Sequence, residues 1–165
     1  MKPFLIILIF VIFATGCADK NAFSKFKMNE AQELSASSLQ SSKVKTKDGK
    51  IKGIFSAIYL NEVYPKEYFG DEYFYIYMYL KERGEGCSLD NIQNSRLKLK
   101  LNSKTPIEVK QLPHKNRFSD LTGIENEWNL YYLVTFKKEG VKKLSILLES
   151  DQFSSDLLVY QKDKQ

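Results

Sequence analysis

Apolar and polar side chains alternate along most of the chain after residue 43, which is the pattern of β-strands that bury one face. The clearest case is the segment 72–80, where tyrosines alternate with other apolar side chains. Aromatic and β-branched residues also favour strands. The pattern predicts eight strands, at about 39–47, 50–60, 72–80, 96–102, 107–112, 128–137, 141–149 and 156–162.

Short pairs of turn-forming residues separate several of these strands. Asp48-Gly49 lies between two alternating segments and predicts a hairpin with a type I′ turn, in which both central residues take a positive φ. Glu139-Gly140 predicts a second hairpin, between the sixth and seventh predicted strands. Consecutive strands joined by such turns run antiparallel.

No segment after residue 43 has the apolar spacing of a helix. The Ser-rich segment 29–42 either holds one or two helical turns around Glu30–Leu34 or leads directly into the first strand. Several short strands with turns between them are typical of an all-β domain. Two antiparallel sheets packed face to face are the simplest way to bury one-sided strands. We therefore expect an all-β, antiparallel two-sheet sandwich of seven or eight strands.

The tyrosines of the segment 72–80 form the first candidate binding surface. If the other face of this strand packs in the core, the side chains that face solvent are Tyr73, Tyr75, Tyr77 and Tyr79. Exposed tyrosines offer flat apolar area with a hydroxyl tip, which suits contact with a sugar or a protein. The alternative is a partly covered face on which the tyrosines pack on each other and on lysine stems.

The N-terminus has the organisation of an export signal. Lys2 is followed by an unbroken apolar segment, Phe4–Phe13, and then by the small residues of Ala14-Thr15-Gly16-Cys17. A basic start, a short apolar core and a small-residue cleavage site define a secretory signal peptide. A membrane-spanning helix needs about 20 apolar residues, so an uncleaved anchor is the weaker alternative.

The segment Ala14–Cys17 resembles the lipobox of bacterial lipoproteins. The resemblance implies that Cys17 becomes the lipidated first residue of the mature protein, carrying a diacylglycerol on its sulfur. It divides the chain into a lipoprotein signal peptide (1–16), a lipidated cysteine with a tether (17–38) and a β-sandwich domain (39–165). In that family an Asp directly after the cysteine retains the protein at the inner membrane. Ala18 stands there instead, which implies an outer-membrane location.

The lipobox and the strand pattern together resemble those of small epsilonproteobacterial lipoproteins with an immunoglobulin-like β-sandwich. This resemblance implies a periplasmic or surface-exposed domain held at the membrane through Cys17. Two or more acyl chains suffice for stable anchoring, where a single chain does not.

The remaining composition narrows the possible chemistry. If Cys17 carries lipid, Cys87 has no partner for a disulfide within the chain, so it is either a half-buried small residue or pairs between chains. His114 is the only histidine and lacks a nucleophile motif, and one histidine with one thiol cannot fill a usual zinc ligand set. We therefore expect no catalytic residues, no metal and no cofactor.

The net charge of +5 is spread along the chain, whereas nucleic-acid binding requires a concentrated basic stripe. We therefore expect no nucleic-acid partner. A second candidate surface is the basic loop formed by Lys110, His114, Lys115 and Arg117. These side chains either meet phosphate or carboxylate groups of envelope polymers or are simply solvated.

The sequence thus predicts a membrane-anchored envelope lipoprotein that acts as a non-catalytic binding or assembly module. Its expected partners are the membrane, through the lipid on Cys17, and an envelope protein or polysaccharide. Two alternatives remain open: a surface-exposed adhesin-like protein, and an envelope polymer hydrolase that uses loop carboxylates.

Overall fold

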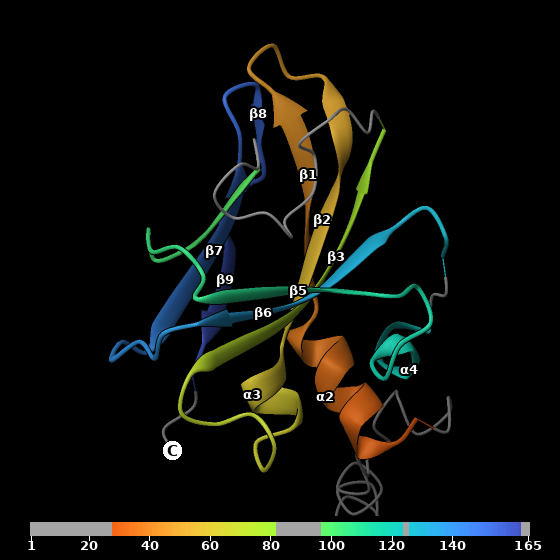
Figure 1. Cartoon of the computed structure of the whole chain (residues 1–165), viewed down its shortest axis with the longest axis vertical. Helices are drawn as coiled ribbons and strands as arrows, with labels where there is room; N and C mark the ends of the chain where they lie inside the picture. Colours follow the sequence, from red (N-terminus) through yellow and green to blue (C-terminus); the bar gives the residue numbers. More distant parts are fainter. Residues whose placement is uncertain (1–27, 82–96, 124–125, 163–165) are drawn as a thin grey trace, which may run out of the picture.

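The computed structural model describes residues 28–81, 97–123 and 126–162. In these ranges nine antiparallel strands form one curled sheet, and three short helices lie together at one end of it (Figure 1). The strands are β1 (Gln40–Thr46), β2 (Ile51–Tyr59), β3 (Glu72–Leu80), β4 (Lys98–Leu101), β5 (Glu108–Leu112), β6 (Leu130–Phe136), β7 (Lys143–Glu149), β8 (Phe153–Ser154) and β9 (Leu158–Gln161). The helices are α2 (Glu30–Ser38), α3 (Leu60–Val63) and α4 (Ser119–Thr122). The all-β prediction is confirmed at this level, and each predicted strand is present.

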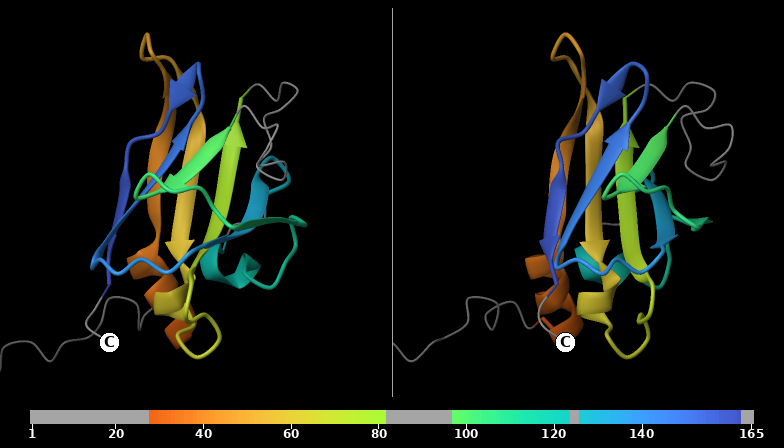
Figure 2. Two further views of the ribbon diagram at one scale, coloured as in Figure 1. Left: turned by 60° about the vertical axis from the view of Figure 1, so that its left-hand side comes forward. Right: turned by 90° about the vertical axis from the view of Figure 1, so that its left-hand side faces the viewer.

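The curled sheet has two arms. The longer arm has the order β1-β2-β3-β6-β5, and the shorter arm consists of β4, β7 and β9. The two-residue strand β8, which was not predicted, joins β7 to β1. Figure 2 shows the blue strands of the shorter arm lying across the orange and yellow strands of the longer arm. Apolar side chains from both arms meet in a first core, which includes Phe55, Phe74, Ile76, Leu101, Tyr132, Val134, Leu144 and Ile146.

The Asp48-Gly49 hairpin is confirmed, because β1 and β2 pair antiparallel on either side of it. The predicted type I′ turn is wrong. Gly49 has a φ of 82°, whereas no described non-glycine residue other than Asn102 and Ser103 has a positive φ. The N–H of Gly49 donates to the carbonyl of Thr46 over 2.9 Å. One residue with positive φ at the end of the loop is the pattern of a three-residue hairpin loop.

The hairpin predicted at Glu139-Gly140 is wrong. Strand β6 pairs with β3 and β5, whereas β7 pairs with β4, β8 and β9. The chain therefore crosses from the longer arm to the shorter arm at this point. The crossing segment is held to the start of β3, because the N–H of Lys138 donates to Asp71 (3.0 Å) and the N–H of Glu139 donates to Glu72 (2.8 Å).

The helices cover half of the outer face of the longer arm and form a second core with it. This core consists of Ile58, Leu60, Val63, Tyr75, Tyr77, Phe118, Leu121 and Tyr131. The predicted exposure of the tyrosine face is therefore wrong for Tyr75, which is fully buried, and for Tyr77, which is 9% exposed. Tyr73 is half-buried, and Tyr79 remains exposed. Strand β3 is thus buried on both faces over most of its length.

Helix α2 packs against this second core, and it lies in the segment 17–38 that was predicted to be a tether. Its first turn is capped by Asn29 and Gln32, whose side chains and backbone N–H groups bond reciprocally over 2.9 Å. The hydroxyl of Ser35 donates to the carbonyl of Leu121 (3.0 Å), and the hydroxyl of Ser38 accepts from the N–H of Tyr59 (3.2 Å). A mostly polar helix is therefore held against α4 and β2 by hydrogen bonds as well as by apolar contact.

Burial also predicts how stability responds to alkaline pH. Loss of water around the phenol raises the pKa of Tyr75 to about 12, against an ordinary value of 10, although a hydrogen bond from Asn116 lowers it slightly. Between these values the unfolded chain binds fewer protons than the folded one, so stability falls as pH rises. The loss from this one group is about 1.4 kcal/mol for each pH unit.

Urea unfolding at pH 9 to 11.5 measures this effect. We expect Tyr75→Phe, which has no phenol at this position, to show a shallower loss of stability with pH than the parent. Equal slopes for the two proteins would contradict the assignment.

Candidate binding groove

The helices cover only part of the outer face of the longer arm. Side chains on this face stand in rows that run across neighbouring strands, and the cover ends between two of these rows. In the covered row, Ile58 of β2 lies opposite Tyr75 of β3. The next row contains Ser41, Ser56 and Tyr77, and the row beyond it contains Lys43, Ile54 and Tyr79. Ile54 is 49% exposed and Tyr79 is 38% exposed, so the outer face opens to solvent at this last row.

An open groove of about 760 Å³ lies where the cover ends. Ser41, Ser56 and Tyr77 line it from the sheet beside Ile54 and Tyr79, and the loop before β6 lines it through Asn126, Trp128 and Asn129. We call these eight residues the aromatic groove. A second hollow of about 480 Å³ adjoins it and shares Tyr79 and Trp128, with Leu80, Lys81 and Glu127 as further lining residues.

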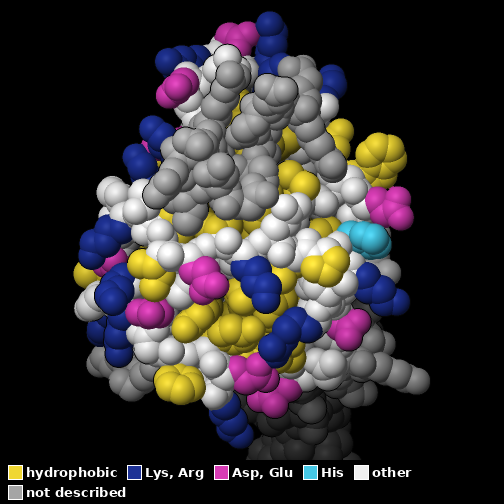
Figure 3. Space-filling model, in the orientation of Figure 1, with side chains coloured by type: hydrophobic (Ala, Val, Ile, Leu, Met, Phe, Trp, Pro, Cys, Tyr) yellow, Lys and Arg dark blue, Asp and Glu magenta, His cyan; other side chains and the backbone are white. Residues whose placement is uncertain are grey.

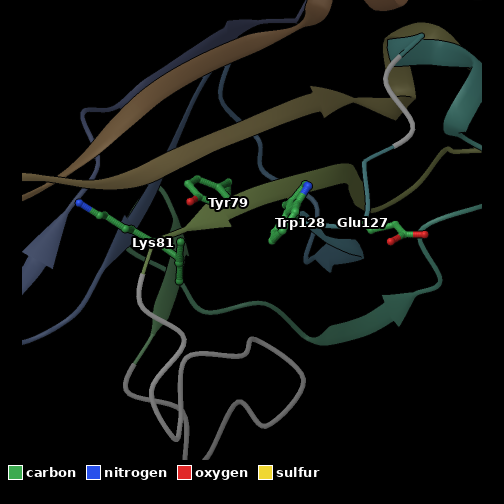
Figure 4. Close-up of a pocket in the computed structure, with 5 residues that line it drawn as sticks. Tyr79, Lys81, Glu127 and Trp128 are labelled. Carbon is green, nitrogen blue, oxygen red and sulfur yellow. The ribbon is translucent and has the colours of Figure 1, made fainter.

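The loop that carries Trp128 is anchored to the sheet by hydrogen bonds. The hydroxyl of Tyr131 donates to the carbonyl of Asn126 (2.9 Å) and accepts from its N–H (3.2 Å). The N–H of Trp128 in turn donates to Oδ1 of Asn126 over 2.7 Å. The indole is nevertheless 70% exposed. A bonded loop thus holds a large aromatic side chain at the surface, and in Figure 4 its ring rises from the same side of β3 as Tyr79.

The sheet side of the groove is uncharged, and it carries hydroxyl groups beside the apolar side chain of Ile54. The hydroxyl oxygens of Ser41 and Ser56 lie 2.8 Å apart, and Ser56 is also hydrogen-bonded to the phenol of Tyr77. Burial raises the pKa of Tyr77, although this hydrogen bond acts in the opposite direction. The three hydroxyl groups therefore stay neutral over the physiological range, and each can donate or accept.

Lysines surround the open end of the groove. Lys43 stands in the same row as Ile54, and Lys52 shares the outward face of β2 because side chains on a strand alternate. The N–H of Lys81 donates to the carbonyl of Lys52 (2.7 Å), and Lys81 lines the adjoining hollow. Glu127, the acidic residue of that hollow, lies beyond Trp128 and points away from Tyr79 in Figure 4. The groove is thus bordered mainly by positive charge.

The predicted basic loop does not form part of this groove. Lys110 lies on the edge strand β5, and His114 and Lys115 are exposed in the loop that follows it. Arg117 forms an ion pair with Glu67 and lies over the ring of Phe118, 5.2 Å from its centre. On the face drawn in Figure 3, basic and acidic side chains are interspersed. The structure gives Arg117 a packing role at the second core.

Two acidic side chains, Glu72 and Glu139, are buried on the opposite side of the sheet from the groove rows. Glu72 accepts hydrogen bonds from the hydroxyl of Tyr59 (2.5 Å), from Nζ of Lys162 (2.7 Å) and from the N–H of Glu139 (2.8 Å). The Glu139 carboxylate lies 2.9 Å from Nζ of Lys104. These contacts join the crossing segment and the C-terminal strand to β3, so both carboxylates hold the fold together.

Sequence reasoning found Tyr77 and Tyr79 but missed the other six residues of the aromatic groove. Trp128 was placed at the start of the predicted strand 128–137, whereas it lies in the loop before β6. The signal in the sequence was the polar context Asn126-Glu127-Trp128-Asn129, which suits a loop. Cys17 and Cys87 lie outside the described residues.

Within the described ranges, no three His, Cys, Asp or Glu side chains are placed to share a metal ion. None of the helices in the same ranges is long and apolar enough to cross a membrane. Comparison with protein-family models, with curated proteins and with solved structures finds no match to this chain.

Proposed function

We propose that this protein is a lipid-anchored, non-catalytic binding module of the bacterial cell envelope and that the aromatic groove is its binding surface. The observation that carries the proposal is Trp128, which is 70% exposed beside a groove lined by apolar side chains and a few uncharged polar groups. Large exposed aromatic side chains next to a concave surface are typical of binding sites. Hydrogen bonds hold the loop of Trp128 in place before any partner binds.

The envelope location rests on the signal sequence and on Cys17. The chain from Cys17 to Met28 spans at most roughly 40 Å when fully extended. It reaches the domain at helix α2, at the lower end of Figure 1, whereas the open rows of the groove lie toward the β1–β2 hairpin at the upper end. The proposed tether therefore enters at the helical end of the domain, away from the open row that contains Ile54 and Tyr79.

We also propose the finer fold and the origin that the resemblance implies. The fold is an immunoglobulin-like β-sandwich, and the lipoprotein is of the epsilonproteobacterial type. In support, the two arms face each other across one core and are joined only through the short strand β8 in the described sheet. A two-sheet sandwich has this arrangement of inward-facing strands.

Lipid attachment tests the proposed location. We expect the full chain, expressed in a bacterium and fed radiolabelled palmitate, to take up label and to fractionate with membranes. Cys17→Ser should remove the label and release the protein from the membrane, since the sulfur is the attachment atom. Label retained by Cys17→Ser would contradict the assignment.

Loss of binding tests the groove. After chemical crosslinking in the native envelope, we expect the anchored protein to co-purify with an envelope component and Trp128→Ser to lose it. Phe69→Ser is the matched control, because Phe69 is 71% exposed and lies outside the groove. Equal recovery by both variants would place the binding surface elsewhere.

The two alternatives give different results. Removal of the domain by protease treatment of intact cells would indicate a surface-exposed, adhesin-like protein. Cleavage of purified envelope polymer by the protein would indicate a hydrolase. We favour binding because the two buried carboxylates, Glu72 and Glu139, are engaged by lysines that join structural elements.

A further inference from the structure

We infer that the aromatic groove takes a segment of an acidic polysaccharide chain. This inference rests on the proposed function and specifies its ligand. It follows from three properties of the groove: two exposed aromatic rings, uncharged polar groups in its lining and a basic border.

The aromatic rings supply flat apolar surface. Trp128 and Tyr79 are 70% and 38% exposed, and Figure 4 shows both rings on the same side of β3. A pyranose ring has one face formed mainly by C–H groups, and this face packs on the π-surface of an aromatic side chain. Because Tyr79 lies in the sheet and Trp128 in a bonded loop, the two rings offer positions for more than one sugar unit.

The polar lining matches sugar hydroxyl groups. Ser41 presents an exposed hydroxyl from the sheet, and Asn126 and Asn129 present half-buried amides from the loop. The hydroxyl of Ser56 is buried beneath them and lies 2.8 Å from that of Ser41. Hydroxyls and amides both donate and accept, as sugar hydroxyls do. A membrane surface would need a protruding apolar face, whereas this surface is concave and carries hydroxyl and amide groups among its apolar side chains. The groove therefore fits a hydrated polymer better than a lipid bilayer.

The basic border selects for negative charge. Lys43 and Lys81 are exposed beside Ile54 and Tyr79, and Lys52 lies on the same outward face. Glu127, the acidic residue in the adjoining hollow, points away from Tyr79. Lysines around a groove attract acidic ligands and discriminate against neutral ones of the same shape. A sugar chain bearing carboxylates or phosphates meets this requirement.

Trp128 is the only tryptophan in the chain, so its fluorescence reports directly on the groove. The purified full-length protein is titrated with an oligogalacturonate, with a neutral cello-oligosaccharide of the same length and with phosphatidylglycerol vesicles. We expect the acidic sugar to shift the emission, with an affinity that falls as salt is added. The neutral sugar should bind at least about tenfold more weakly.

Substitutions in the groove test whether the acidic sugar binds there, and calorimetry measures its affinity for each variant. We expect Tyr79→Ala to weaken binding by about thirtyfold, as for an aromatic hot spot. Lys43→Gln and Lys81→Gln should each weaken it by about fivefold, and Lys115→Gln, outside the groove, should leave it unchanged.

The outcomes separate this inference from the proposed function. Equal binding of acidic and neutral sugars would overturn the acidic specificity, and preferential vesicle binding would identify a lipid surface instead. If neither sugar shifts the emission of Trp128 but Trp128→Ser still loses its envelope partner, the polysaccharide ligand is overturned and the binding module stands. If neither sugar shifts the emission and Trp128→Ser also keeps its envelope partner, both proposals are overturned.

Discussion

Replacing Tyr75 by Ser is expected to lower the free energy of unfolding by about 3–5 kcal/mol, as for other large buried side chains. Tyr75 is fully buried, and its ring centre lies 5.0 Å from that of Phe118 and 6.2 Å from that of Tyr131. Serine would leave a cavity in the second core beside Phe118 and Tyr131. Urea unfolding followed by circular dichroism measures the loss.

Two matched variants show whether this loss comes from the second core. Tyr75→Phe keeps the ring and should change stability by less than about 1.5 kcal/mol. Tyr79→Ser removes the exposed tyrosine of the same strand face and should change it by no more than about 0.5 kcal/mol. If Tyr75→Ser were as mild as Tyr79→Ser, the helices would not cover Tyr75 in solution.

Replacing Glu72 by Ala is the second change with a large expected effect, again about 3–5 kcal/mol. Glu72 is 2% exposed, and its loss would leave the ammonium of Lys162 without its carboxylate partner in a mostly buried position. The hydroxyl of Tyr59 and the N–H of Glu139 would also lose their acceptor. Differential scanning calorimetry at neutral pH measures the resulting fall in melting temperature.

The exposed pair of Lys45 and Asp156 is the control for the buried network. Its side chains are 43% and 71% exposed and lie 3.3 Å apart, so Lys45→Ala should cost less than about 1 kcal/mol. A loss of stability in Glu72→Ala no greater than in Lys45→Ala would show that the network does not hold the crossing segment to β3.

The strands were predictable because their signal is local. Alternation of side chains and turn-forming pairs fixed the extent of β3 and the site of the β1–β2 hairpin without any knowledge of neighbours. The crossing at Glu139 was not predictable in this way. Its N–H bonds to Glu72, 67 residues earlier in the sequence, and a Glu-Gly pair looks the same in a turn and in a crossover.

The prediction that the tyrosines face solvent failed for a related reason. Alternation in 72–80 shows that two faces exist, but both faces carry apolar rings, so the pattern does not say which one is covered. The cover on Tyr75 comes from Phe118, next to α4, and α4 is in turn held by α2, whose buried residues are Ser35 and Ser38. A polar helix that docks through hydrogen bonds has little hydrophobic periodicity to reveal its buried face.

The groove required information that only the fold contains. It combines side chains from β1, β2, β3 and a loop, and the register of three strands decides that Ser41, Ser56 and Tyr77 stand in one row. Trp128 joins them because Tyr131 anchors its loop. Only Tyr79, on the strand with the strongest pattern, was identified beforehand and proved accessible.

The most direct test of the binding surface is site-specific photo-crosslinking in the living cell. A photoreactive amino acid replaces Ile54 at the groove or, as the control, Leu157, which is 59% exposed and lies just before β9. The lipid-anchored protein should form a discrete adduct with an envelope component from position 54 and none from position 157. The same adduct from both positions, or from position 157 alone, would contradict a partner seated beside Trp128.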